Sequence, residues 1–537
     1  MFKRSGQSRL VAQRFTLSAM FFTAILGLCW LPFVVRAEAG LAGDGEGTRG
    51  AGGGSGENPR DEIPPAAVVL DYPNRIHKLE ADLTAPGTAV VVTADDVTLD
   101  LNGHTITYNA EPSSTSAFGV YVAVGVDRVT ITNGTILQGA GKSPDSPAIL
   151  LYGASWQAGP HMIHDLVIRT VGVESGGIQA DKGYSFNGSK IFRTYIEVLG
   201  DTSAIDGYGA DPLSLSAQNR GGIEIHDNIL VGGHRGMQLI YIGADNANRS
   251  DVYKNRIQQK RRPGSKAPYG ILLAGRSHNV HIYENQIISD DGRGINVDGW
   301  GQGVEVGASG NFVYRNRIDV QYSSSATEGE YVENNVYGIR DRYSSGDNTF
   351  EGNTIIAASD VRGDVFGIFV GSDETDPLMR NIIVRNNTIV ARRGKIQANE
   401  PYAFQFSPAD SVTVTDNKYL ADGFSVGDEA VGRLTLSGNS VLTTESGIPP
   451  APEGVAVTRF LDSYLIEWTE VATKGVFEYV IYRDGKRLPI SPRGGTFYVD
   501  LDAAAARAYS VSAMTVDGRE GPRSTEVSTE AAADGWW

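Results

Sequence analysis

A six-residue pattern repeats twelve times along the chain and constrains its fold more than any other feature. The pattern is an apolar residue, two variable residues, usually an asparagine, one variable residue and a second apolar residue. The copies begin 22 to 37 residues apart. A period of this length predicts one supersecondary unit stacked on copies of itself. The copies are LNGHTI from Leu101, ITNGTI from Ile131, IHDLVI from Ile163, IFRTYI from Ile191, IHDNIL from Ile225, VYKNRI from Val252, IYENQI from Ile282, VYRNRI from Val313, FEGNTI from Phe350, VRNNTI from Val384, VTDNKY from Val414 and LSGNSV from Leu436.

The residue types within these copies predict strands rather than helices. The segments are short, rich in β-branched residues and bounded by Gly, Asn and Asp. In the last eight copies the asparagine occupies the same position. Asparagine side chains stacked at a sharp corner can bond to one another and to the backbone, so we expect a ladder along the stack. Together these features predict a parallel β-helix.

A second strand recurs between the hexads, and it opens with Gly or another small residue followed by an apolar one. The Gly permits a bend between faces. Each coil is therefore expected to hold at least two strands, and periodicity alone leaves a third one open. The copies are GIQAD (177–181), GMQLIY (236–241), GILLAG (270–275), GINVDGW (294–300), GIRDRY (338–343), GIFVGS (367–372), AFQFSP (403–408) and GFSVGD (423–428).

The ends of the chain differ from the repeats. Residues 1–39 combine a basic start, a long apolar run and the tripeptide Ala37-Glu38-Ala39, which predicts a signal peptide with an uncleaved membrane anchor as the alternative. Residues 40–61 are expected to form a Gly-rich linker, and 62–447 the β-helix. A Pro-rich linker at 448–452 precedes a last domain at 453–530 and a tail at 531–537.

Residues 453–530 contain alternating strand patterns that resemble a fibronectin type III module. Trp468 lies in an early strand, and YVIYR, which begins at Tyr479, occupies the central one. The segment YSVSA, which begins at Tyr509, matches the tyrosine-corner strand of such sandwiches. The resemblance implies a small β-sandwich after the solenoid.

The hexad repeat resembles the right-handed parallel β-helix superfamily from about residue 95 to residue 445. That superfamily includes polysaccharide lyases, uronan C5-epimerases, glycosidases of pectin and proteins of no known activity. The resemblance therefore implies an all-β fold, a right-handed parallel β-helix followed by a small β-sandwich, and a polysaccharide as partner. The epimerase signature Asp-Pro-His-Asp is absent, since Leu-Ser follows Asp211-Pro212 and Leu-Met follows Asp376-Pro377. A pectate-lyase-like motif is also absent.

The charge balance limits the classes of partner. The net charge is -16, so no basic excess exists to neutralise nucleic acid phosphates. An acidic glycan would need a local basic site on this protein. We expect a monomer that is secreted to the periplasm, the cell surface or the medium, with no membrane contact beyond the signal segment.

Alternation along the second strands predicts which side chains point outward. Stacked coils lie ~4.8 Å apart, which places Asn296 beside Arg340 and Asp298 beside Arg342. For a lyase, Arg340 and Arg342 are the candidate cations that neutralise a uronate carboxylate. His234 or Tyr343 is the candidate base or acid. The candidate substrate-binding residues are polar or aromatic, namely Asn296, Asp298, Trp300, Gln238, Tyr241 and Gln405.

Carboxylates near the second strands suggest one cofactor, since Asp298 together with Asp290 and Asp291 is a candidate Ca²⁺ site. Ordinary roles also account for these residues, because Asp298 and Arg342 can form a cross-coil ion pair and His234 can be a turn residue.

The sequence therefore leads to three hypotheses. We favour a lyase or C5-epimerase of an acidic glycan, with a non-catalytic carbohydrate-binding or cell-surface adhesion protein as the alternative. A glycoside hydrolase would need two outward carboxylates about 5–10 Å apart. The clear outward acids, Asp181 and Asp298, are expected several coils apart.

Overall fold

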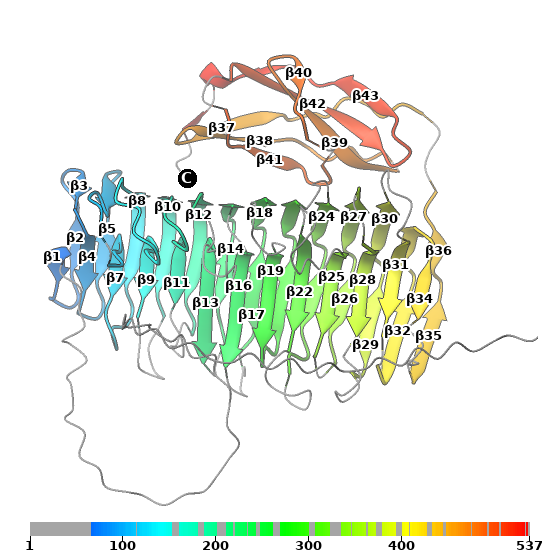
Figure 1. The fold of residues 1–537 in the computed structure, drawn as a ribbon, viewed down its shortest axis with the longest axis horizontal. Coiled ribbons are helices and arrows are strands. Elements are labelled where there is room, and N and C mark those ends of the chain that lie inside the picture. The colour runs from blue at the N-terminus through cyan, green and yellow to red at the C-terminus, as the bar shows by residue number, and fades with distance from the viewer. Residues whose placement is uncertain are drawn as a thin grey trace, which may run out of the picture. The chain divides into compact units, whose positions relative to one another are not determined.

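The computed structural model divides the chain into two units, Met1–Gly54 and Ser55–Trp537. The predicted signal peptide and Gly-rich linker, residues 1–61, lie outside the described residues. Figure 1 shows the described strands in chain order. The described residues are 66–113, 115–152, 160–180, 187–200, 211–218, 221–232, 235–242, 248–260, 269–290, 292–299, 307–322, 335–344, 346–360, 363–371, 379–393, 400–407, 409–426, 432–443, 447–473, 475–490, 493–503, 506–531 and 533–534.

The repeats form a parallel β-helix, as the sequence predicted. One strand of each coil joins a 13-stranded parallel sheet, here called sheet A. This sheet contains the second, Gly-led strands of the sequence. Its members are β1 (Ala66–Leu70), β4 (Thr88–Val92), β7 (Val120–Val122), β9 (Ile149–Leu151), β11 (Ile178–Ala180), β13 (Leu213–Gln218), β16 (Arg235–Ile242), β19 (Tyr269–Gly275), β22 (Arg293–Asp298), β25 (Val336–Arg342), β28 (Val365–Gly371), β31 (Pro401–Phe406) and β34 (Phe424–Val426).

The first half of each hexad belongs to a second parallel series, here called sheet B. Pairing continues without interruption from the first coil to the last. Its members are β2 (Ile76–Lys78), β5 (Thr98–Asp100), β8 (Thr130–Gln138), β10 (Met162–Thr170), β12 (Lys190–Val198), β14 (Glu224–His226), β17 (Ser250–Tyr253), β20 (Val280–Tyr283), β23 (Phe312–Tyr314), β26 (Thr349–Glu351), β29 (Ile382–Arg385), β32 (Ser411–Thr415) and β35 (Arg433–Ser437).

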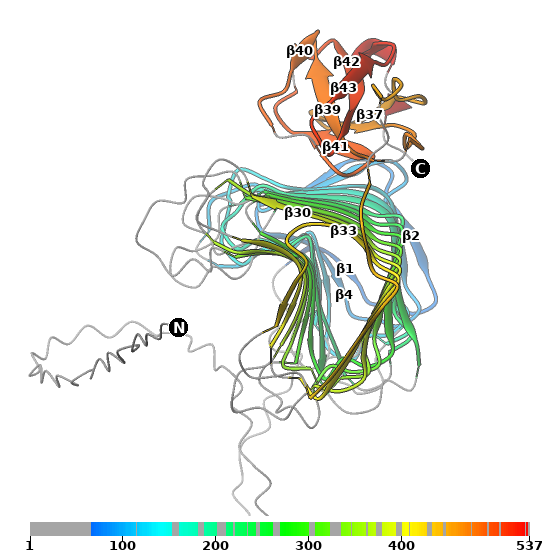
Figure 2. The ribbon, with the colours of Figure 1, turned by 90° about the vertical axis from the view of Figure 1, so that its right-hand side faces the viewer.

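The second half of each hexad supplies the third strand that periodicity could not reveal. This series, here called sheet C, also contains the later residues of the long strands β8, β10 and β12. Figure 2 looks along the stack and shows strands of successive coils lying over one another. The other members are β3 (Leu83–Thr84), β6 (Thr105–Tyr108), β15 (Ile229–Gly232), β18 (Arg256–Lys260), β21 (Gln286–Asp290), β24 (Arg317–Tyr322), β27 (Thr354–Ser359), β30 (Thr388–Arg393), β33 (Lys418–Leu420) and β36 (Ser440–Val441).

Each hexad is therefore a corner between sheets B and C. Its third residue is left-handed in many coils, with φ of 55° at Asp227, 54° at Lys254 and 55° at Glu284. Such angles are uncommon for residues other than glycine, so the neighbouring contacts must hold the turn. Ion pairs between stacked corners contribute, as in Glu284 with Arg315 at 3.1 Å.

The expected asparagine ladder lies at the fourth residue of these corners. The Nδ2 of Asn285 donates to Oδ1 of Asn316 at 3.0 Å, and Asn316 donates to Asn353 at 3.0 Å. Each amide also donates to a backbone carbonyl, such as Ile282 for Asn316. The ladder is confirmed along its whole predicted length, which runs through Asn228, Asn255, Asn285, Asn316, Asn353, Asn387, Asn417 and Asn439.

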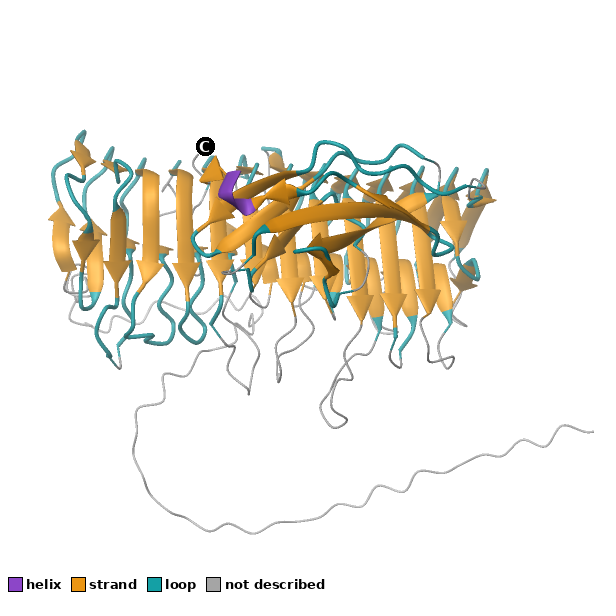
Figure 3. Cartoon of the chain, turned by 90° about the horizontal axis from the view of Figure 1, so that it is seen from above, coloured by secondary structure: helices purple, strands orange, loops and turns teal. Residues whose placement is uncertain are grey.

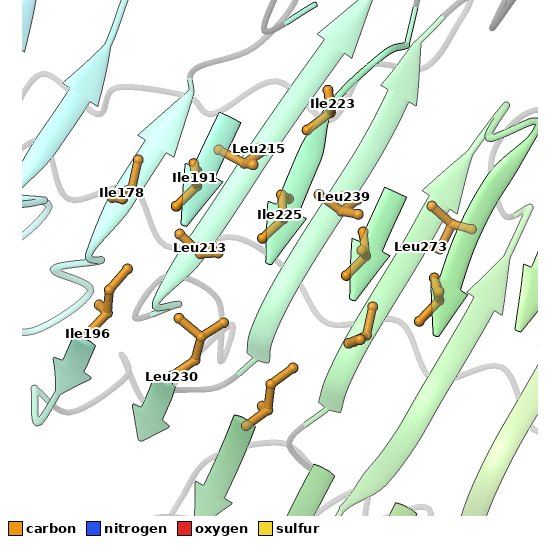
Figure 4. Packing of buried hydrophobic residues seen from close by; sticks show 14 of the residues in the cluster. Ile178, Ile191, Ile196, Leu213, Leu215, Ile223, Ile225, Leu230, Leu239 and Leu273 are labelled. Atoms are coloured by element: carbon orange, nitrogen blue, oxygen red, sulfur yellow. The ribbon is translucent and has the colours of Figure 1, made fainter. Parts of the chain in front are cut away.

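The apolar hexad positions form the core, as predicted. Ile225 of sheet B, Leu230 of sheet C and Leu239 of sheet A are all at most 1% exposed and belong to one cluster. Figure 4 shows these side chains meeting between the sheets. The Gly that opens the sheet A strands has a packing reason, because a Cβ at Gly294 would lie 2.3 Å from the carbonyl oxygen of Gly338.

The C-terminal part is built differently, from two sheets whose strands are antiparallel except for the pair β37 and β45. Figure 3 shows strands and loops with a single short 3-10 helix, η3 (Thr529–Ala531), among the described residues. Side chains from both sheets, including Ile466 and Val511, share one buried cluster. Its identification as a fibronectin type III-like module stays a prediction. One sheet contains β41 (Phe497–Asp500), β38 (Ser463–Glu467), β37 (Ala456–Phe460) and β45 (Ala533–Asp534); the other contains β40 (Lys486–Arg487), β39 (Val476–Arg483), β42 (Ala508–Thr515), β43 (Glu520–Arg523) and β44 (Val527–Ser528).

Buried polar contacts join this C-terminal part to the outer face of sheet C. The amide of Gln258 accepts from the Val499 N–H at 2.8 Å and donates to the Val499 carbonyl at 2.7 Å. Arg392 donates to the carboxylate of Glu478, which is 1% exposed. Removal of one partner would strand a buried charge, so these contacts fix the C-terminal part against the solenoid.

We expect Asn316→Ala to destabilise the protein more than Asn439→Ala. The first change removes the acceptor of the Asn285 backbone N–H and of Asn285 Nδ2, and the donor to the Ile282 carbonyl and to Asn353 Oδ1, at a cost of about 2–4 kcal/mol. Asn439 ends the ladder and is partly exposed. Thermal unfolding followed by circular dichroism measures the difference, and equal midpoints for the two variants would contradict a cooperative ladder.

Candidate functional site

The outer face of sheet A gathers arginine and aromatic side chains from five neighbouring coils, β19 to β31. Ile295, Val297 and Ile339 point into the core, so Asn296, Asp298 and Arg340 point outward by alternation. The rings of Tyr269 and Tyr337 share this face with Arg293 and Arg340, because the guanidinium groups lie over these rings. We call this set the arginine–aromatic face. Its members are Tyr269, Arg293, Asn296, Asp298, Tyr337, Arg340, Arg342, Phe366, Phe369, Tyr402 and Gln405.

One row of this face lies at the residue that precedes the small, strand-opening residue. Strand pairing places Tyr269 beside Arg293, Arg293 beside Tyr337, Tyr337 beside Phe366, and Phe366 beside Tyr402. The sequence interpretation missed this row because it began each strand at the Gly. The signal was present as YG, RG, YG, FG and YA in consecutive coils.

The arginines of the face lie against aromatic rings. The guanidinium carbon of Arg293 is 4.9 Å from the ring centre of Tyr269 and 5.5 Å from that of Tyr337. Arg340 lies 4.8 Å from Tyr337 and 5.9 Å from Phe369. Cation–π contacts of this kind hold planar guanidinium groups in fixed orientations. Tyr337 contacts both arginines and therefore links two coils of the site.

These arginines create a positive region in an acidic protein. Burial lowers the pKa of Arg293 to about 10, and the nearby cations Arg340 and Arg342 act in the same direction. Burial and Arg342 also lower the pKa of Arg340. Burial and like charge both disfavour the cationic form, so an anion placed here would relieve both penalties.

Asp298 holds a third arginine. Its Oδ2 accepts a hydrogen bond from Arg342 Nη2 at 2.9 Å and another from Asn296 Nδ2 at 3.2 Å. Burial tends to lower the pKa of Arg342, but the carboxylate of Asp298 outweighs it and the pKa is raised. Arg342 also lies 4.5 Å from the ring centre of Tyr343. Arg342 therefore remains cationic and fixed.

The two predicted neighbour relations on this face are confirmed. Asn296 pairs with Arg340, and Asp298 pairs with Arg342. The side chain of Gln405 is partly exposed. Gln405 is the strand partner of Phe369, which is in turn the strand partner of Arg340.

The other predicted site residues are placed less fully. Gln238 pairs with Leu272 and Tyr241 with Gly275, so both lie in sheet A. His234 and Trp300 lie outside the described residues.

The candidate calcium site is not brought together by the described contacts. Asp290 lies in β21 of sheet C and pairs with Arg493 at 2.6 Å, whereas Asp298 pairs with Arg342 on sheet A. Asp291 lies outside the described residues. Among the residues that the structure describes, no three His, Cys, Asp or Glu side chains are grouped to hold a metal ion. The calcium site stays a prediction.

A buried carboxyl lies behind the face and was not foreseen. Asp341 sits between Arg340 and Arg342 in β25 but pairs with core residues Val297 and Val370, so it points inward. It is 0% exposed and accepts a hydrogen bond from Asn348 Nδ2 at 3.1 Å. Burial raises its pKa to about 7.

Comparison with known proteins gives matches at the level of solved structures. No protein-family model matches the sequence, and no curated protein matches it. A double mutant of the tailspike protein of E. coli bacteriophage HK620 is 12% identical with a TM-score of 0.42, over 86% of this chain and 81% of its own. XylC in complex with xylose is 13% identical with a TM-score of 0.37, over 82% of this chain and 68% of its own.

A third match is the A-module of the mannuronan C-5 epimerase of Azotobacter vinelandii. It is 14% identical with a TM-score of 0.36, over 71% of this chain and 91% of its own. The similarity is low in all three cases. The assignment of the fold therefore rests on the strand pairing within this chain.

Replacement of Asp341 tests the buried carboxyl. Between about pH 4 and pH 7 the unfolded chain releases this proton and the folded protein keeps it, so rising pH destabilises the fold by up to about 4 kcal/mol. Asp341→Asn keeps an acceptor for Asn348 and removes this contribution. We expect a flatter dependence of the thermal midpoint on pH in the variant. Parallel curves for the two proteins would contradict the raised pKa.

Proposed function

We propose that the arginine–aromatic face binds an acidic polysaccharide. The observation that carries this proposal is the buried pair Arg293 and Arg340, whose pKa values are lowered by burial and by neighbouring cations. In a chain with a net charge of -16, such a positive region is built at a cost. A bound carboxylate or sulfate would be attracted by these closely spaced guanidinium groups and would offset the repulsion between them.

The arrangement of the face favours a polymer over a small anion. Tyrosine, phenylalanine, arginine and amide side chains continue across five coils in strand register. Neighbouring coils are ~4.8 Å apart, about the advance of one sugar ring along an extended chain. Rings can pack on sugar faces while polar groups fix the hydroxyls and acid groups.

A lyase or C5-epimerase is the second candidate, because both reactions begin by removing the proton beside a uronate carboxylate. One contact favours it. Arg293 donates a hydrogen bond to the hydroxyl oxygen of Tyr269, which places a cation beside a hydroxyl group that could carry a proton in these reactions. Tyr343 and His234 remain alternative proton carriers.

The hydrolase hypothesis has less support. Asp298 is the single carboxylate among the described outward positions of β19, β22, β25, β28 and β31. A hydrolase requires two carboxyl groups.

The proposal also includes the export of the protein and the identity of its C-terminal domain. We infer export from the predicted signal peptide, and a fibronectin type III-like identity for the C-terminal sheets from Trp468 and the Tyr509 strand. Tyr509 donates to the side-chain carboxylate of Asp500 at 2.8 Å, whereas the tyrosine corner of such modules uses a backbone acceptor. In the part of the chain that the structure describes, no helix has the length and apolar character to cross a bilayer.

Binding is tested with polygalacturonate, alginate and a neutral glucan by isothermal titration calorimetry. We expect the protein to bind at least one polyuronate, more weakly as salt rises. Arg340→Ala should weaken binding tenfold or more, by roughly 1.4 kcal/mol or more, and Arg340→Lys less. The matched control is Arg315→Ala on the B–C corner, whose side chain is 61% exposed. Equal affinity for the neutral glucan, or no effect of Arg340→Ala, would remove the proposal.

Catalysis is tested separately by the ultraviolet absorbance of the unsaturated product of β-elimination during incubation with each polyuronate. An increase that is lost in Arg340→Ala and Tyr269→Phe would identify a lyase that uses this face. A flat trace with retained binding excludes the lyase, and nuclear magnetic resonance of the product then distinguishes an epimerase from a non-catalytic binding protein.

A further inference from the structure

Two buried polar atoms on neighbouring coils of the arginine–aromatic face have no hydrogen-bond partner among the residues that the structure describes. They are the amide oxygen Oδ1 of Asn296, an acceptor, and the Nε–H of Arg342, a donor. Asn296 is 0% exposed. Buried polar groups are nearly always paired in native proteins, and an unpaired one is costly. An acceptor and a donor left open together on one face indicate a ligand group that can serve both.

Asp298 fixes the orientation of both side chains. Its Oδ2 accepts from Asn296 Nδ2 at 3.2 Å, so the amide nitrogen faces the carboxylate and the amide oxygen is turned away from it. The same Oδ2 accepts from Arg342 Nη2 at 2.9 Å. The ring of Tyr343 lies against Arg342. Neither side chain can rotate to satisfy the open atom without loss of its bond to Asp298.

Asn296 and Arg342 lie close to Arg340, the cation that would bind the acid group of the sugar. Asn296 is the strand partner of Arg340, and Asp298 is the partner of Arg342. The open acceptor and donor therefore lie on adjacent coils, next to Arg340. A sugar whose carboxylate meets Arg340 would place a hydroxyl of that sugar, or of its neighbour, near Asn296.

We propose that Asn296 and Arg342, positioned by Asp298, recognise an unsubstituted ring hydroxyl beside the acid group, and so select polyuronates that carry no ester there. A hydroxyl can donate to Asn296 Oδ1 and accept from Arg342 Nε–H. An acetylated oxygen can only accept and would leave Asn296 unpaired. This inference rests on the proposed binding of an acidic polysaccharide and adds the substitution state of its ligand.

The test compares one polyuronate with and without O-acetyl groups. Affinities of polygalacturonate and chemically acetylated polygalacturonate are measured by calorimetry for the wild-type protein, Asn296→Leu and Arg340→Ala. We expect the wild type to prefer the unacetylated polymer about tenfold. Asn296→Leu should bind the unacetylated polymer more weakly and lose most of the preference. Arg340→Ala should lower the affinity for both polymers and keep the preference for the unacetylated one.

The possible outcomes separate this inference from the function on which it rests. If the wild type binds neither polymer nor any other acidic glycan, the proposed function fails. If it binds both equally, or if Asn296→Leu keeps the wild-type preference, the recognition of a hydroxyl by Asn296 is wrong. Should Asn296→Leu fail to fold by circular dichroism, Asn296→Val provides a smaller, β-branched replacement for the same comparison.

Discussion

Coil-to-coil stacking in strict register is the constraint on which the rest of this structure depends. Parallel pairing places residues of equal position in columns, one coil above the next. At the corner between sheets B and C, the amide of each Asn donates to the next Asn and to a backbone carbonyl, as Asn285 does to Asn316 and Val252. A shift of one residue would break every such bond and turn the core side chains outward. The ladder therefore fixes the register for all three sheets.

The same rule of columns accounts for features outside the core. On the outer face of sheet B, rings stack in register, with centroids 4.7 Å apart for His226 and Tyr253 and 5.0 Å apart for Tyr253 and Tyr283. These rings stack face to face on one another, and the stacking stabilises the pairing of neighbouring coils. On sheet A the column instead places Arg293 between the rings of Tyr269 and Tyr337, and stacked rings follow from Tyr337 through Phe366 to Tyr402. An arginine held between rings has a fixed orientation, which fits the proposed binding role.

Sheet C has a different surface, and the C-terminal part covers it. Apolar side chains such as Val231 and Ile288 point out of the solenoid there and pack with Phe497 and Val499. Arg493, 3% exposed, pairs with Asp290 at 2.6 Å. Breaking such buried pairs is costly even where their net contribution to stability is small. The C-terminal part is thus bound to the solenoid through buried apolar and charged contacts, whereas a flexible tether would show few such contacts.

The sequence by itself determined the coil. The hexad period, the apolar positions and the recurring asparagine are local features that repeat in every coil. Each copy therefore indicates the same geometry, and the sequence predicted the parallel β-helix, its core and its asparagine ladder. The sequence also predicted that Asn296 lies beside Arg340 and Asp298 beside Arg342, because the order of residues along paired strands determines which residues are neighbours. Long-range contacts were decided only by the tertiary structure. The sequence around Asp290 did not indicate its ion pair with Arg493, some 200 residues later. The sequence around Arg293 did not indicate that the side chain of Arg293 is buried. The sequence specifies neighbours along and across strands, while burial, charge coupling and the docking of the C-terminal part arise from packing between elements distant in the chain.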